Sequence, residues 1–344
     1  MIDMKTTKLI QLDGSEGGGQ MLRTALTLAM VTGQPFRITN IRGKRRKPGL
    51  MRQHLTCVKA ACEISGGTAD GAEPGSTELV FHAGEVRPAS YEFAIGTAGS
   101  TGLLLQTLLP ALWLAGGTST LRLSGGTHNP LAPPFDFLER VFLPAIQRMG
   151  AQAELRLLET GFAPVGGGII ECQIQPTKGF TPFHLTNHGA LISSCIRVPS
   201  RGLSTSIADR VLQAALQTCP CEDAQAIDLA AGPGQGVACL VESQFSEVSE
   251  MACTFGEMNV SAEKVGHRAG KMMNDFINTG AAVGRNLADQ LLLPIALAGE
   301  GSFTTMAPDA HVPTNISVIE AFLPVRFQIE RMDGGLWSVS CAQK

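Results

Sequence analysis

The chain has 344 residues, of which 44% are hydrophobic and 17% are charged. This length and composition predict a folded protein with a sizeable core, and they exclude an intrinsically disordered chain. The net charge of −3 argues against a protein that coats nucleic acid non-specifically, but it leaves room for a local basic groove.

No segment of the sequence indicates secretion or membrane insertion. The polar stretch from Met1 to Lys8 contains no apolar signal core. The most apolar stretch, 102–115, is interrupted by Gln106 and Pro110 and is too short to cross a bilayer. The nine cysteines are irregularly spaced and complete no zinc set. We therefore expect a cytoplasmic protein with reduced thiols and no membrane partner.

An apolar helix followed by a strand is predicted three times along the chain. The helix ends at a glycine in each copy, and the copies cover residues 20–41, 104–123 and 288–306. Leu-Leu-Pro occurs in the last two copies, which makes the match more than compositional. In this register Arg23, Gln106 and Gln290 occupy equivalent positions.

The spacing of the copies predicts an inserted domain. Arg23 and Gln106 are 83 residues apart, whereas Gln106 and Gln290 are 184 apart, an excess of 101. We place the insert at 184–278 and the large domain at 1–183 plus 279–344. Both parts mix strands and helices, so the predicted fold class is α/β (α+β), with a large domain of repeated units.

A glycine-rich turn near the start of the chain is the first candidate site. It runs from a predicted strand at Leu12 through three glycines to a helix that starts near Gln20. Bare backbone N–H groups at a helix N-terminus bind anions, and Arg23 lies one helical turn further on. A tight strand-to-helix turn without a ligand explains the same residues.

A basic segment follows, with six Lys or Arg residues between Arg42 and Arg52. Because Pro48 and Gly49 predict a turn, these side chains cannot share one helical face. Phosphate binding is favoured because positive charge is concentrated here in an acidic chain. The alternative is a solvated loop.

Two later segments are predicted to be loops that could form a pocket. The first is the proline-rich segment 125–136, and the second is 308–315, which contains His311. A lone histidine in a loop is more often a surface residue than a catalyst, and no spacing of histidines indicates a metal cage.

Taken together, the motifs resemble those of the RNA 3′-terminal phosphate cyclase family, in the same order and over nearly the whole chain. Six ordered blocks carry this resemblance: Asp13 to Arg23, Arg42 to His54, Gln106 to Trp113, Ser124 to Asp136, Gly161 to Gly168, and Ala288 to Asn315. The resemblance implies repeated βαβαββ-type units, as in enolpyruvate transferases, with a smaller inserted α/β domain.

The resemblance also implies a reaction. ATP and an RNA with a 3′-terminal phosphate would be the substrates, Mg²⁺ or Mn²⁺ the metal, and His311 the nucleophile that becomes adenylylated. Glu16 and Asp289 are the metal candidates. The positions that match the family's nucleotide, phosphate or metal contacts are Glu16, Arg23, Arg42, Arg45, Gln53, His54, Gln106, Pro133, Asp289 and Gln290.

Two positions depart from the family's pattern. Asn286 stands where we expect an aromatic residue that stacks on adenine, and Thr160 stands where a basic residue is usual. The rival readings are a catalytically inactive relative used in ribosome assembly and an enolpyruvate transferase-like enzyme. His311 and the arginines favour the cyclase. The sequence leaves the physiological RNA, the metal preference and the oligomeric state open.

Overall fold

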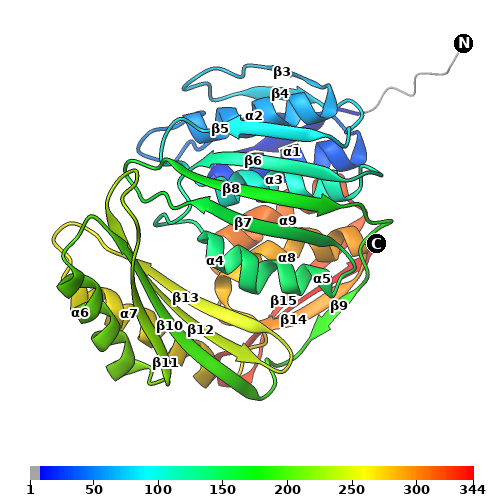
Figure 1. The fold of residues 1–344 in the computed structure, drawn as a ribbon. Helices are drawn as coiled ribbons and strands as arrows, with labels where there is room; N and C mark the ends of the chain where they lie inside the picture. Colours follow the sequence, from blue (N-terminus) through cyan, green and yellow to red (C-terminus); the bar gives the residue numbers. More distant parts are fainter. Residues whose placement is uncertain (1–7) are drawn as a thin grey trace, which may run out of the picture.

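The structure is a computed structural model that describes residues 8–344. Residues 1–7, which make up most of the polar segment used above, lie outside the described residues. Three four-stranded sheets and the helices packed against them form one body, and a fourth sheet with two helices lies beside it (Figure 1). Within residues 8–344, no helix combines the length and apolarity that a membrane span requires.

The first unit places the glycine-rich turn and the basic segment. Its elements are β1 (Ile10–Asp13), α1 (Gly19–Thr32), β2 (Phe36–Thr39), α2 (Arg52–Ser65), β3 (Thr68–Asp70) and β4 (Leu79–His82). The sheet order is β1-β2-β4-β3, and only the β1–β2 pair is parallel. Helix α1 ends at Gly33, whose φ of 71° is left-handed and favours glycine.

The second unit repeats this order. Its elements are β5 (Ser90–Ala94), α3 (Thr101–Trp113), β6 (Ser119–Gly125), α4 (Phe135–Phe137), η1 (Leu138–Phe142), α5 (Leu143–Gln147), β7 (Gln152–Glu159) and β8 (Gly168–Gln175). The sheet order β5-β6-β8-β7 again has one parallel pair, β5–β6. The second helix of the unit is divided into α4, η1 and α5.

The third unit has the same strand order but is interrupted in sequence. Its elements are β9 (Phe183–Leu185), α8 (Arg285–Ala298), β14 (Gly301–Thr305), α9 (His311–Phe322), β15 (Val325–Arg331), η2 (Asp333–Gly335) and β16 (Trp337–Gln343). Strand β9 is parallel to β14, as β1 is to β2. The three sheets therefore confirm the predicted α/β class and the repeated βαβαββ unit.

The chain between β9 and α8 forms the fourth sheet, with the order β11-β10-β12-β13. Its elements are β10 (Leu191–Arg201), α6 (Thr205–Thr218), β11 (Asp223–Asp228), β12 (Gly236–Phe245), β13 (Ser249–Phe255) and α7 (Ala262–Thr279). Helices α6 and α7 pack on one face of it and bury an apolar core separate from the main one. We call these elements the inserted sheet.

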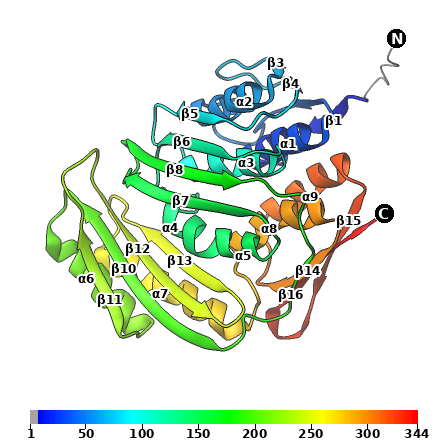
Figure 2. The ribbon, with the colours of Figure 1, turned by 45° about the vertical axis from the view of Figure 1, so that its right-hand side comes forward.

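Strand β13 lies at the edge of the inserted sheet that faces the second unit, next to η1 (Figures 1 and 2). The sequence-based boundary at 184 falls within β9, which pairs with β14 and so belongs to the third unit's sheet. The division into two independently folding domains stays a prediction.

Candidate active site

A cleft of ≈ 470 Å³ opens between the three units and the inserted sheet. The equivalent repeat positions Arg23, Gln106 and Gln290 all line it, because α1, α3 and α8 direct matching faces toward the centre of the large body. His311 lines the same cleft from the start of α9. The repeats detected in the sequence thus bring residues from distant segments to one place.

Two structural groups form opposite parts of the cleft lining. The repeat units contribute the helices just named and the loop that contains Pro133. The inserted sheet and α7 contribute the remaining residues, which are Cys253, Thr254, Phe255, Glu257, Val265 and Arg268. No motif in the sequence pointed to this second wall.

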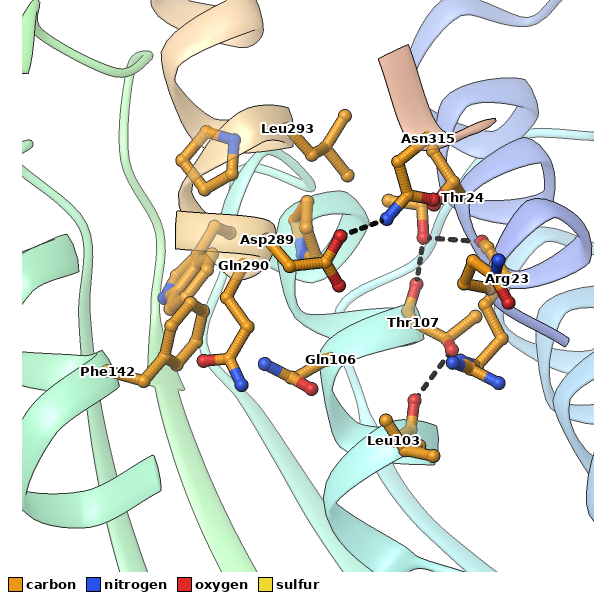
Figure 3. Close-up of a pocket in the computed structure, with 15 residues that line it drawn as sticks. Arg23, Thr24, Leu103, Gln106, Thr107, Phe142, Asp289, Gln290, Leu293 and Asn315 are labelled. Atoms are coloured by element: carbon orange, nitrogen blue, oxygen red, sulfur yellow. Dashed lines mark hydrogen bonds between the residues drawn. The ribbon is translucent and has the colours of Figure 1, made fainter. Parts of the chain in front are cut away.

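A smaller pocket of ≈ 100 Å³ lies between α1, α3 and α8 and shares Arg23, Gln106 and Gln290 with the cleft (Figure 3). Pro110 and Pro294 lie inside α3 and α8, four residues after the two glutamines. Because proline has no N–H, the backbone carbonyls of Gln106 and Gln290 lack their helical donor. The side chains of the two glutamines line the pocket together with apolar residues such as Trp113 and Phe142.

Asp289 is held in this pocket by neighbouring helices. Its Oδ1 accepts a hydrogen bond from Asn315 Nδ2 at 2.7 Å, and Thr24 Oγ1 donates to Asn315 Oδ1 at 3.0 Å (Figure 3). Burial raises the pKa of Asp289, and the Asn315 hydrogen bond opposes that rise. The network joins α8, α9 and α1, so it fixes the carboxyl group relative to Arg23.

His311 is the first residue of α9. Residues 311–315 were predicted as loop, and this prediction was wrong. Pro313 is accommodated because it falls in the first helical turn, where its missing N–H would have no helical partner. The His311 backbone N–H donates to Asp309 Oδ1 at 2.8 Å, and its Nδ1 lies 3.4 Å from Asp309 Oδ2.

This geometry suits His311 for nucleophilic attack. Its side chain is 46% exposed at the cleft, so a substrate can reach it. With Asp309 beside Nδ1, the neutral tautomer that carries its proton on Nδ1 is favoured, which leaves the lone pair on Nε2. A neutral imidazole of this kind can attack phosphorus without prior removal of a proton.

The glycine-rich turn places the N-terminus of α1 beside a cluster of basic side chains. A side chain at Gly19 would collide with His54 Nε2 and come within 2.9 Å of Arg23 Nη1, and one at Gly18 would lie 3.0 Å from Arg45 Nη2. The glycines therefore let three donors approach the helix N-terminus. This arrangement fits an anion.

His54 is buried in this cluster, and its pKa is lowered to about 3 by burial and by the charges of Arg23 and Arg42. It is therefore neutral at physiological pH. Its Nδ1 accepts from the backbone N–H of Met51 at 3.1 Å. The proton must then reside on Nε2, which makes this atom a donor toward the start of α1.

Arg42 and Gln53 have structural contacts as well. Arg42 has a φ of 56° and donates through Nη1 to the carbonyl of Gly49 at 2.8 Å, which closes the basic loop. Gln53 Oε1 accepts from the backbone N–H of Ser100 at 3.1 Å and joins α2 to the start of α3. Neither residue is among those that line the cleft.

The two acidic metal candidates lie in different surroundings. Glu16 is 67% exposed and pairs with Lys44 Nζ at 2.5 Å, whereas Asp289 is held by Asn315 within the cleft. Between residues 8 and 344 no group of three or more His, Cys, Asp or Glu side chains is arranged to hold a metal.

The loop that carries Pro133 is anchored by a buried histidine. His128 Nε2 lies 2.9 Å from Asp136 Oδ2, and its Nδ1 lies 2.9 Å from Thr127 Oγ1. The backbone N–H of Phe135 also donates to the carbonyl of Thr127 at 3.0 Å. These bonds close the base of the loop and hold Pro133 at the cleft.

Sequence reasoning missed three residues of this site. Asp309 precedes His311 by two residues, a spacing that could have suggested an orienting carboxylate. Asn315 holds Asp289 from a helix far along the chain, and Phe255 reaches the cleft from the edge of the inserted sheet. The last two depend on tertiary packing, which no local pattern reveals.

Two solved structures show a weak overall similarity. The enolpyruvyl transferase NikO from Streptomyces tendae is 14% identical with a TM-score of 0.39, and the match covers 96% of this chain and 47% of that one. EPSP synthase from Acinetobacter baumannii is 12% identical with a TM-score of 0.30, covering 98% and 65%. The chain thus spans about half and just under two thirds of these proteins.

The fold and the site define an α/β protein of three βαβαββ units whose central cleft, lined by arginines and by the imidazole of His311, suits phosphate-bearing substrates. A family model described as RNA 3′-terminal phosphate cyclase matches residues 14–329. An RNA 3′-terminal phosphate cyclase of Pseudomonas fluorescens is 48% identical over 336 residues, covering 97% of this chain and 98% of that protein. The chain belongs to the RNA 3′-terminal phosphate cyclase family, which confirms the predicted family and enzyme class.

Proposed function

We propose that this protein converts an RNA 3′-terminal phosphate to a 2′,3′-cyclic phosphate at the expense of ATP, through a covalent adenylate on His311. The observation that carries this proposal is that His311 lines a cleft shared with Arg23 and has Asp309 beside its Nδ1. Family membership supports the overall reaction.

In the first step, His311 Nε2 attacks the α-phosphorus of ATP. A P–N bond forms, the bond between the α-phosphorus and the bridging oxygen breaks, and pyrophosphate leaves. The imidazole becomes cationic as it is adenylylated, and the Asp309 carboxylate 3.4 Å from Nδ1 stabilises that charge.

In the second step, an oxygen of the RNA 3′-phosphate attacks the adenylate and breaks the P–N bond, which restores His311 and gives an RNA-(3′)pp(5′)A anhydride. In the third step, the oxygen of the adjacent 2′-hydroxyl attacks the 3′-phosphorus and its proton is released to solvent, while AMP leaves with the bridging oxygen. The activated phosphate makes ring closure favourable because AMP is a far better leaving group than hydroxide.

The cluster at the start of α1 would hold the phosphates. Arg23, Arg45 and neutral His54 present N–H donors around the helix N-terminus, and such donors stabilise charge on phosphoryl oxygens. Arg42 supports the same loop. Gln106 and Gln290 line the cleft nearby and are suited to bind nucleotide hydroxyl groups.

A divalent cation fits this site only in part. When bound, Mg²⁺ or Mn²⁺ would balance phosphate charge. Glu16 is accessible and could supply one carboxylate ligand. Asp289 lies in the cleft, but Asn315 already occupies its Oδ1, and burial disfavours its charged form. We therefore favour Glu16 over Asp289 as the ligand.

The adenine base would lie between Pro133 and the start of α8. Asn286 offers hydrogen bonds there but little stacking surface. Apart from His311, Phe255 is the one aromatic side chain among the described residues that line the cleft. We assign to Phe255 the stacking contact that Asn286 cannot make.

The proposal is tested with ATP and a short RNA that carries a 3′-phosphate. The expected product resists phosphatase and becomes sensitive after acid opens the cyclic phosphate, and one AMP is released for each end closed. A ribosome-assembly relative without catalytic activity would give no product. Phosphatase-sensitive ends and no AMP after prolonged incubation with ATP and Mg²⁺ or Mn²⁺ would contradict the proposal.

A further inference from the structure

A buried carboxyl group joins the inserted sheet to the cleft. Glu250 lies on β13 and is 5% exposed. Its Oε2 accepts a hydrogen bond from the backbone N–H of Gly284 at 2.7 Å, and its Oε1 accepts from the N–H of Met251 at 3.0 Å. No basic side chain within residues 8–344 forms an ion pair with it. The two oxygens of this carboxyl group therefore accept hydrogen bonds from backbone N–H groups.

Gly284 is fitted to this contact. It is the N-cap residue of α8, a 14-residue helix, and its carbonyl accepts from the N–H of Ala288. A Cβ atom at Gly284 would lie only 2.7 Å from Glu250 Oε2 and 2.8 Å from its Cδ. The absence of a side chain is thus required for the carboxyl group to reach the backbone N–H.

Both partners of this contact belong to elements that form the cleft. Strand β13 carries Glu250 and, five residues later, Phe255. The first residues of α8 after Gly284 are Arg285 and Asn286, and both line the cleft. One hydrogen bond therefore connects the strand that bears Phe255 to the helix that bears Asn286.

A cavity lies beside the hydrogen bond between Glu250 and Gly284. A cavity of ≈ 170 Å³ separates α7, β13 and the start of α8, and four of its eleven lining residues are methionines, among them Met272, Met273 and Met306. Unbranched methionine side chains adapt readily to movement and specify a position poorly. The Glu250 hydrogen bond is the directional contact at this joint.

We propose that Glu250 is a positioning residue for nucleotide binding: its carboxyl group holds the first turn of α8 against the inserted sheet and thereby sets the separation between Asn286 and Phe255. This inference rests on the proposed function, because it assigns the base to that part of the cleft. His311 and Asp309 come from other segments, so Glu250 acts on ATP affinity and leaves the chemistry intact.

The test measures the initial rate of protein adenylylation against ATP concentration. Glu250→Ala is expected to raise the apparent KM for ATP about tenfold, with the rate at saturating ATP within about twofold of wild type. Glu250→Gln keeps an oxygen that accepts from Gly284 and should restore KM to within about threefold. A purely structural loss would lower the saturating rate instead.

Glu242→Ala is the matched control. Glu242 lies on the neighbouring strand β12 and binds Arg140 of η1 at 3.0 Å, so it also links the inserted sheet to the repeat units but does not contact α8. Its KM for ATP should stay within about twofold. Gly284→Ala should reproduce the KM of Glu250→Ala, and it serves as the test if that variant does not fold.

The outcomes separate this inference from the proposed function. If the wild-type protein forms no adenylate, the proposed function fails. If it does, the positioning role is overturned by a folded Glu250→Ala variant with wild-type KM, by a Gln variant as impaired as Ala, or by an equal effect of Glu242→Ala.

Discussion

The two walls of the cleft are built differently. The repeat-unit wall is tied by hydrogen bonds between helices, such as those that run from Thr24 through Asn315 to Asp289. The wall from the inserted sheet meets the start of α8 across a cavity whose lining includes four methionines, and Glu250 supplies the hydrogen bond that spans this joint. One wall is therefore suited to hold reacting groups in place, and the other to adjust around a bound nucleotide.

This difference predicts how mutations act. Changes to the nucleophile or to the phosphate donors of the repeat-unit wall should lower the rate of chemistry. Changes in the inserted wall should alter nucleotide affinity and leave the saturated rate close to that of wild type. A variant of the inserted wall that abolished turnover while it still bound ATP would break the comparison.

The largest effect is expected for His311. Both His311→Ala and His311→Asn should abolish transfer of label from α-labelled ATP to the protein, since neither side chain can form a phosphoramidate. The Asn variant keeps a polar side chain at the start of α9, so ATP should still bind. Label retained on either variant would show that a residue other than His311 is the nucleophile.

The next effect is expected for the basic loop. Arg42→Ala and Arg45→Ala each remove a charge-assisted contact worth about 1.5–3 kcal/mol, so adenylylation should fall by roughly ten- to a hundredfold while the protein stays folded. Arg46→Ala, at an exposed position of the same loop, is the control and should change the rate less than about twofold. If all three variants are adenylylated at the wild-type rate, the segment does not bind phosphate and is a solvated loop.

A smaller effect, on affinity alone, is expected for the two residues assigned to the base, which are Phe255 on the inserted wall and Asn286 on the first turn of α8. Stacking of a base on an aromatic ring contributes about 1–3 kcal/mol, so Asn286→Tyr should lower the ATP concentration needed for adenylylation by about fivefold. Phe255→Ala should raise it by a similar factor. ATP titrations that leave both variants at the wild-type requirement would show that base stacking does not limit affinity.

The smallest effect concerns pH and stability. Burial raises the pKa of Glu250 to about 7, above its ordinary value of 4.5. The unfolded chain therefore releases this proton first, and the contribution of Glu250 to stability is present at low pH and is lost as pH rises from about 4.5 through about 7. Chemical denaturation should therefore show that the free energy of unfolding of wild type falls relative to that of Glu250→Gln as pH rises over this interval. A pH-independent difference would contradict the assignment.

Much of the repeat-unit wall could be predicted from the sequence. The helices that end at Gly33 and Gly299 are marked by periodic apolar residues and a glycine stop, and the registration of Arg23, Gln106 and Gln290 placed three cleft residues correctly on equivalent helices. These features are local or repeated, so they leave a trace in the order of residues.

The rest depends on packing between distant segments. Nothing local distinguishes Phe255 from any aromatic residue on a strand, and its place in the cleft follows from how the edge strand β13 meets the second and third units. Glu250 would be read as a surface residue, because its partner is a backbone N–H that lies 34 residues further along the chain. The segment 308–315 was predicted to be a loop, whereas α9 begins at His311.

The most direct test of the account is to locate the adenylate in the wild-type protein. After incubation with ATP and Mg²⁺ or Mn²⁺ in the absence of RNA, peptide mass spectrometry should find AMP on the peptide that contains His311, with the acid lability expected of a phosphoramidate, and addition of RNA ending in a 3′-phosphate should remove it. AMP found on a lysine or on another histidine, or an adduct that RNA does not discharge, would contradict the account.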